Sequence, residues 1–66
     1  MRMRFDSDAD ALYVRFSERP IEETSEVRPG VMLDFDADGH IVGMEILNAS
    51  EALGVADLKK LAVEVA

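Results

Sequence analysis

Cysteine and tryptophan are absent from this chain of 66 residues, and histidine occurs only once, as His40. Without cysteine, no disulfide can stabilise the fold and no thiolate can hold a metal ion. One histidine alone does not make a zinc site. A single domain of this length buries only about 60% of the surface that its unfolded chain exposes. We therefore expect that a monomer would be only marginally stable, and that the chain enlarges its hydrophobic core by pairing with another chain.

Basic residues and long apolar runs are also scarce. Seven lysines and arginines stand against fourteen acidic residues, which gives a net charge of −7. Because contacts to phosphates need a basic face, we expect no binding to nucleic acid. No apolar run approaches the roughly 18 residues of a membrane span, and the first residues carry no apolar signal segment. The sequence therefore predicts a cytoplasmic protein that does not enter the membrane.

Apolar residues make up 48% of the chain, and most of them alternate with polar residues. This period of two indicates β-strands, separated by acidic or Pro-Gly turns. The stretch 21–28 is weakly apolar and highly charged, which is typical of an edge strand. The predicted strands cover residues 1–5, 11–16, 21–28, 31–35 and 40–47. The predicted inward residues are Phe5, Leu12, Val14, Phe16, Val31, Leu33, Phe35, Val42, Met44, Ile46, Leu58 and Leu61.

The last third of the chain changes to helical spacing. Asn48 followed by Glu51 resembles a capping box, and Gly54 and Asp57 indicate an interruption and a second start. The sequence therefore predicts one α+β domain over residues 1–66. A single antiparallel sheet of five strands, arranged as a meander, would span 1–47. A C-terminal helix at 48–66 would pack on one of its faces.

The stretch 34–45 matches the calcium-loop pattern of an EF-hand from Asp34 to Glu45. Pro29-Gly30 stands too close to Asp34 for the entering helix, and the β-rich residues after Gly39 favour a strand. The sequence therefore predicts a hairpin turn, in which Asp caps the backbone and Gly39 adopts positive φ. The alternative is a module that binds divalent cations weakly through Asp34, Asp36 and Asp38. We expect no other cofactor.

The residues offer little to an enzyme. The serines lack a nucleophile-elbow context, and no glycine-rich phosphate loop is present. Catalytic sites usually combine a nucleophile, a base and anion-stabilising donors, whereas this chain offers carboxylates. We expect no catalytic residues and no enzymatic activity.

The strand 40–47 is apolar on both faces. By alternation, Ile41 and Leu47 lie opposite the inward side, and a single helix covers only one face of a sheet. Large apolar patches are rare on soluble monomers. We therefore expect a homodimer, or a complex with a small protein partner, and the net charge suits a basic partner. The predicted interaction surface consists of Tyr13, Met32, Ile41 and Leu47.

Five segments together resemble a known family. They are 5–6, 10–17, 29–31, 33–39 and 41–50, with Leu12-Tyr13-Val14-Arg15-Phe16 in the second and Asp36-Ala37-Asp38-Gly39 in the fourth. The combination is similar to the prokaryotic domain-of-unknown-function family 2283, over about residues 5 to 50. The resemblance implies a small free-standing cytoplasmic domain with no catalytic residues to transfer. It also implies an antitoxin-like or other partner-binding role. Together with the apolar faces of the strand 40–47, it leads us to expect a non-catalytic interaction module, either a homodimer or an antitoxin-like partner of a basic protein.

Overall fold

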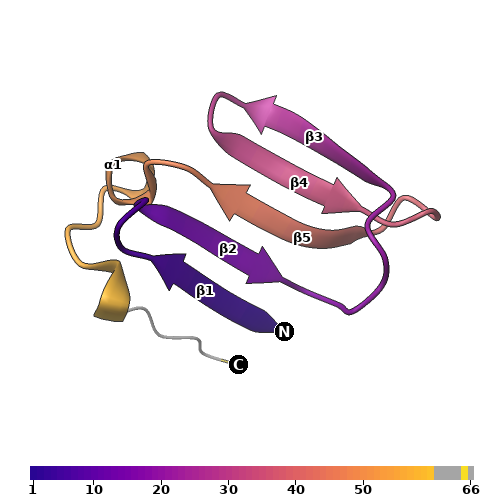
Figure 1. Ribbon diagram of the computed structural model, residues 1–66, viewed down its shortest axis with the longest axis horizontal. Coiled ribbons are helices and arrows are strands. Elements are labelled where there is room, and N and C mark those ends of the chain that lie inside the picture. The colour runs from indigo at the N-terminus through magenta and orange to yellow at the C-terminus, as the bar shows by residue number, and fades with distance from the viewer. Residues whose placement is uncertain (61–64, 66) are drawn as a thin grey trace.

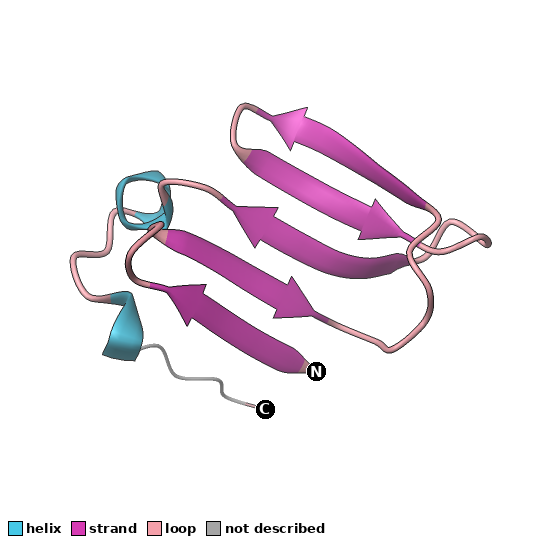
Figure 2. Ribbon diagram, in the orientation of Figure 1, coloured by secondary structure: helices cyan, strands magenta, loops and turns pink. Residues whose placement is uncertain are grey.

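The computed structural model describes residues 1–60 and 65, and it forms a single antiparallel sheet followed by two short helical segments (Figures 1 and 2). The predicted fold class is confirmed, with five strands and a short C-terminal helix. None of the described helices is long and apolar enough to cross a membrane. The elements are β1 (Arg2–Asp6), β2 (Ala11–Arg15), β3 (Glu23–Arg28), β4 (Val31–Phe35), β5 (Ile41–Ile46), α1 (Ala49–Leu53) and the 3-10 helix η1 (Leu58–Lys60).

The strands lie in the order β1-β2-β5-β4-β3. The hairpins β1–β2, β3–β4 and β4–β5 join neighbours, as a meander requires. At one place the order departs from the chain, because β5 pairs with β2 and thereby separates β2 from β3. The connection 16–22 crosses one end of the sheet to reach the far edge (Figure 1). This order puts apolar β5 in the centre and charged β3 at an edge, where charges discourage unwanted strand pairing.

Register divides the sheet into two faces of different chemistry. On the face that we call the polar face, the row through Tyr13 and Glu45 runs across all five strands as Arg4, Tyr13, Glu45, Met32 and Glu26. The opposite face, which we call the apolar face, carries almost only hydrophobic side chains. Its members are Met3, Phe5, Leu12, Val14, Phe16, Val31, Leu33, Phe35, Ile41, Val42, Met44 and Ile46, with Glu23, Ser25, Val27 and Arg28 on β3.

Two β-bulges shape the apolar face. In β5, Asp34 pairs with Gly43 but Phe35 pairs with Ile41, so Val42 is an extra residue. An extra residue shifts the alternation by one, which brings Ile41 onto the same face as Phe35. The sequence predicted Ile41 on the opposite face, and this prediction is wrong because strict alternation does not anticipate a bulge. In β3, the register shift between Glu26 and Arg28 acts in the same way, so that Arg28 lies on the apolar face opposite Val31.

The core gathers at one end of the apolar face. Leu12, Val14 and Ile46 from the sheet pack with Ala49 and Leu58, and all five are buried. Figure 1 shows α1 and η1 at this end, where β2 begins and β5 finishes. The predicted inward residues of the strands share this face.

Burial is incomplete at the other end of the apolar face. Phe16 lies one residue beyond β2, at the end of the sheet away from α1, and it is 43% exposed. The sequence predicted Phe16 as an inward residue. It does lie on the predicted face, but it is not buried there. Leu61, the last predicted core residue, lies outside the described residues.

The C-terminal segment is less helical than predicted over 48–66. α1 ends at Leu53, because Gly54 adopts φ 65 and donates its backbone N–H to Glu51 and Ser50 carbonyls. The interruption at Gly54 is thus confirmed. Asp57 accepts a hydrogen bond from the backbone of Lys59 at the start of η1, as its predicted capping role requires.

Asp10, not Asn48, caps the start of α1. Asn48 has the left-handed φ of 49 and makes no side-chain capping bond, so the predicted capping box is wrong. Instead the Asp10 carboxylate accepts from the Ser50 backbone N–H at 3.1 Å and from the Ser50 hydroxyl at 2.6 Å. The Asp10 carbonyl also accepts from Ala49 N–H at 2.8 Å. The β1–β2 turn therefore holds the helix from 40 residues away in sequence.

Candidate functional site

The acidic turn between β4 and β5 is organised around the carboxylate of Asp36. Its Oδ1 accepts from the backbone N–H of Asp38 at 3.0 Å and of His40 at 2.8 Å. The turn closes through Asp36 N–H to His40 carbonyl, at 2.9 Å, and Gly39 adopts φ 84. The hairpin prediction is confirmed. The turn is not the calcium loop of an EF-hand, because strands rather than helices flank it.

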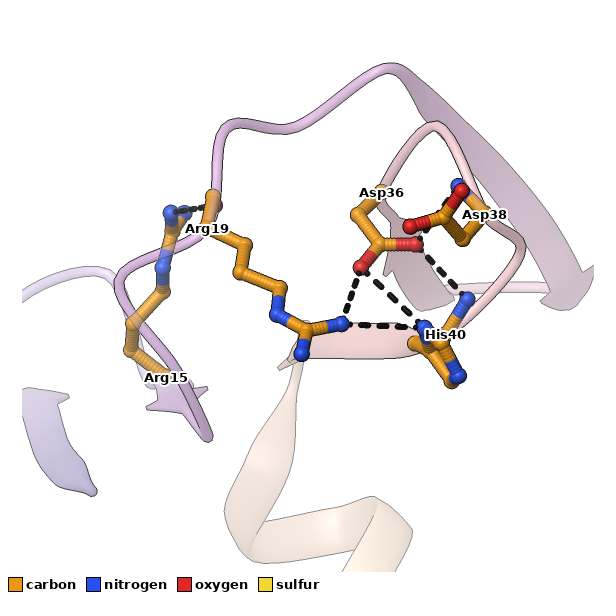
Figure 3. Close-up of polar contacts among 5 residues, drawn as sticks. All are labelled: Arg15, Arg19, Asp36, Asp38 and His40. Carbon is orange, nitrogen blue, oxygen red and sulfur yellow. Dashed lines mark hydrogen bonds and ion pairs between the residues drawn. The ribbon is translucent and has the colours of Figure 1, made fainter.

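Arg19 completes this turn from the β2–β3 connection. Its guanidinium lies 3.0 Å from Asp36 Oδ2 and 3.0 Å from His40 Nδ1 (Figure 3). Arg15 fixes the connection in turn, since its guanidinium donates to the carbonyls of Ser17 at 2.7 Å and Arg19 at 2.5 Å. The sequence carries no local signal for this contact, because Arg19 and Asp36 are 17 residues apart.

The contacts of Asp36 change its acidity. Burial by itself raises the pKa of its carboxyl group. Hydrogen bonds from Arg19 and from the backbones of His40 and Asp38, with the charge of His40, outweigh burial and lower the pKa from 3.8 to about 2. The group is therefore a stable anion whose hydrogen-bonding capacity is largely used within the turn.

The structure regroups the predicted cation ligands. Asp36 and Asp38 stay together and His40 joins them, with ligand atoms within 4.8 Å of one another. Asp34 is elsewhere: its carboxylate is buried on the polar face and accepts from the Thr24 hydroxyl at 2.6 Å. In this arrangement the Arg19 guanidinium already provides a cation to Asp36 and a donor to His40. Weak cation binding stays a prediction, and the geometry does not strengthen it.

Asp10 and Ser50 line an open hollow of about 550 Å³ beside α1 and η1. Their polar groups bond to each other and so serve the cap of α1. Elsewhere, the Ser17 hydroxyl is the one buried side-chain polar atom of the described residues that has no hydrogen-bond partner. A serine needs an adjacent base to become a nucleophile, and none of the described residues offers a base bonded to this hydroxyl. Neither feature combines the groups of a catalytic site.

The four residues of the predicted interaction surface do not share one face. Tyr13 and Met32 flank Glu45 on the polar face, where both are half-buried. Ile41 is 49% exposed on the apolar face. Leu47 follows β5 and lies beside Gly30, with 41% of its surface exposed. Their role in an interface stays a prediction, but the bulge in β5 removes the geometric reason for grouping them.

The exposed hydrophobic residues of the strands gather instead on the apolar face. Met3, Phe16, Val27 and Ile41 are between 43% and 49% exposed there. Around them Leu33, Phe35 and Met44 are half-buried. Strict alternation missed the contribution of Ile41, because it depends on a bulge that no local sequence signal marked. The end of this face with Phe16 and Ile41, which the described residues leave uncovered, is the candidate interaction site.

The sheet, its capped turns and its partly uncovered face define a small α+β protein without a recognisable catalytic constellation among the described residues. The chain belongs to the family described as Protein of unknown function (DUF2283), whose family model matches residues 2–50. The matched region contains all five strands, the Asp36 turn and both partners of the Asp10–Ser50 contact. Neither a search of curated proteins nor a search of solved structures found a match.

Proposed function

We propose that this protein is a non-catalytic interaction module that binds a protein partner through the uncovered end of its apolar face. One observation carries the proposal. The sheet presents a continuous hydrophobic face, and the described residues cover it with Ala49 and Leu58 at one end. Domains normally bury an apolar sheet face beneath a second layer. A partner protein would supply that layer over Phe16, Ile41 and their neighbours.

The polar face is a weaker candidate for the same role. Its central row alternates Arg4, Tyr13, Glu45, Met32 and Glu26, so it suits contact with water. Burying such charges requires a partner that pairs each of them. The apolar face makes no such demand over most of its area.

Methionine oxidation tests the proposal with internal controls. Met3 and Met44 lie on the apolar face, Met32 lies on the polar face, and Met1 is 71% exposed. Peroxide converts exposed methionine to its sulfoxide, which mass spectrometry measures at each position. The chain would be oxidised inside its host cells and, separately, as highly diluted purified protein.

We expect Met3 and Met44 to oxidise more slowly in cells than in dilute solution, while Met32 keeps its rate relative to Met1. Ile41→Glu should abolish this protection, whereas Arg4→Glu on the polar face should preserve it. Equal rates for Met3 and Met44 in cells and in dilution would contradict the proposed function.

A further inference from the structure

We infer that the partner is a second copy of this chain, packed apolar face to apolar face about a two-fold axis that runs across the strands. The inference rests on the proposed function, which requires only that some protein covers this face. It adds the identity of that protein and the symmetry of the assembly. The observation behind it is the charge pattern of β3.

β3 places one charge of each sign on the apolar face. Glu23 pairs with Phe35 and Arg28 pairs with Val31, so both charged residues lie on the side of the hydrophobic residues of β4. Ser25 lies between them, opposite Leu33. Both charged residues are exposed, and among the described residues neither forms an ion pair or a side-chain hydrogen bond in the single chain. On the apolar face, this edge strand therefore presents in order an acidic residue, Ser25, Val27 and a basic residue.

A two-fold axis across the strands at the level of Ser25 makes this edge complementary to itself. It brings Glu23 of one copy opposite Arg28 of the other, twice. An isologous interface requires this reciprocity. An axis parallel to the strands would instead place β3 over β1 of the second copy, where Met3 and Phe5 give the two charges no partner.

The hydrophobic rows follow the same symmetry. Ser25 belongs to a row of register partners that continues through Leu33, Met44, Val14 and Met3, and the axis lays this row on its own copy. The bare end of each sheet, with Phe16 and Ile41, then meets the partner end that carries α1. The result is a two-layer sandwich, in which aligned sheets pack about 10 Å apart.

The net charge of the chain by itself suggests a basic partner. The charges on the apolar face instead favour a second copy of the chain. Glu23 and Arg28 are the charged strand residues on this face, and they cancel. A basic protein would find no acidic patch there to attract it. A second copy, although it carries the same net charge of −7, meets this face without placing acid against acid.

Charge reversal with complementation tests the geometry. Glu23→Arg places arginine against Arg28 of the partner, and Arg28→Glu places glutamate against Glu23, so each variant alone contains two repulsive pairs. We expect either change to raise the dimer dissociation constant by about tenfold or more. In an equimolar mixture the two variants should form a heterodimer, since both of its pairs are then attractive. Glu26→Arg reverses the same charge on the polar face of the same strand and is the matched control.

Sedimentation equilibrium measures the result, and far-ultraviolet circular dichroism verifies that each variant is folded. We expect the wild-type chain and Glu26→Arg to sediment at twice 7.3 kDa, and the mixture to recover that mass. Failure of the mixture to recover it, or equal loss with Glu26→Arg, would overturn the proposed axis. A wild-type monomer at all concentrations would overturn the second copy as partner. In that case, protection of Met3 and Met44 in cells would still support the proposed function with a different protein partner. Lack of protection would contradict the proposed function as well.

Discussion

Gly43 stands where the neighbouring strand leaves no room for a side chain. A Cβ atom at this position would lie 2.7 Å from Oδ2 of Asp34, whose carboxylate is buried and bonded to Thr24. Hydrogen in place of a methyl group thus permits a buried acid at the centre of the polar face. The requirement is steric, because the backbone of Gly43 does not have a positive φ.

We therefore expect Gly43→Ala to destabilise the protein by about 1–3 kcal/mol, as overpacking of a filled site usually does. Urea unfolding at equilibrium measures this change. In an Asp34→Ala background the clash partner is absent, so the added cost of Gly43→Ala should largely disappear. An equal cost in both backgrounds would show that the contact with Asp34 is not the cause.

Asp36 illustrates how one residue depends on distant donors. Its pKa of about 2 lies below the ordinary 3.8, so the ionised carboxylate stabilises the fold above pH 3.8. As the pH falls through 3.8 toward 2, the folded state keeps the charge that the unfolded state loses, and this stabilisation disappears.

Replacing Arg19 by glutamine removes the charged donor and should raise the Asp36 midpoint from about 2 toward 3.8. Carbon-detected NMR of the side-chain carboxyl follows the titration directly. Arg28→Gln, at an exposed arginine that forms no ion pair with the other described residues, should leave the midpoint unchanged. A midpoint insensitive to Arg19 would assign the shift to the backbone donors alone.

At the scale of the elements, the turns are held by contacts that link distant parts of the chain. Asp10 and Asn48 both adopt a left-handed backbone, with φ of 51 and 49, but only the Asp10 side chain bonds to the start of α1. Glycine tolerates this backbone well, so substitution by glycine isolates the side-chain contribution at each position.

We expect Asp10→Gly to destabilise the protein by about 1–2 kcal/mol, because the hydrogen bonds from Ser50 to the Asp10 carboxylate are lost. Asn48→Gly should change stability by only a few tenths of that amount or increase it. Thermal unfolding of the two variants gives the comparison. A larger loss for Asn48→Gly would restore the capping role that the sequence suggested for Asn48.

The β4–β5 turn leads to an expectation about calcium. Asp36 already accepts bonds from two backbone amides and from Arg19, and the flanking strands do not supply the helices of an EF-hand. We expect calorimetric titration with calcium to show no binding at micromolar concentration. Micromolar binding that is lost in Asp36→Asn would contradict this expectation and revive the cation-binding alternative.

At the scale of the whole molecule, the sheet is a single layer with one apolar face and one polar face. The described residues bury that apolar face at one end only. Stability should therefore depend on whatever covers the other end. When a second copy does so, assembly and folding are linked through the protein concentration.

We expect the thermal midpoint of the wild-type chain to fall on hundredfold dilution, because dilution removes the stabilising partner. Scanning calorimetry measures the thermal midpoint at the higher protein concentration, and circular dichroism measures it at the lower one. Glu23→Arg, as the weakened dimer, should show a smaller dependence. A midpoint that is constant on dilution would contradict self-association.

The sequence by itself determined the local features of this protein. Alternating residues predicted the strands, the charges of 21–28 predicted an edge, and Gly39 and Gly54 marked a tight turn and a helix end. These features depend on backbone conformation and side-chain periodicity within a few residues, which a single sequence displays.

The tertiary structure alone decided which distant residues meet. The bulges brought Ile41 and Arg28 onto the apolar face, the insertion of β5 separated β2 from β3, and Arg19 reached Asp36 across 17 residues. Likewise Asp10 replaced Asn48 as the cap of α1. Each outcome depends on strand order or register, and these arise from packing of the whole sheet, for which local spacing carries no signal.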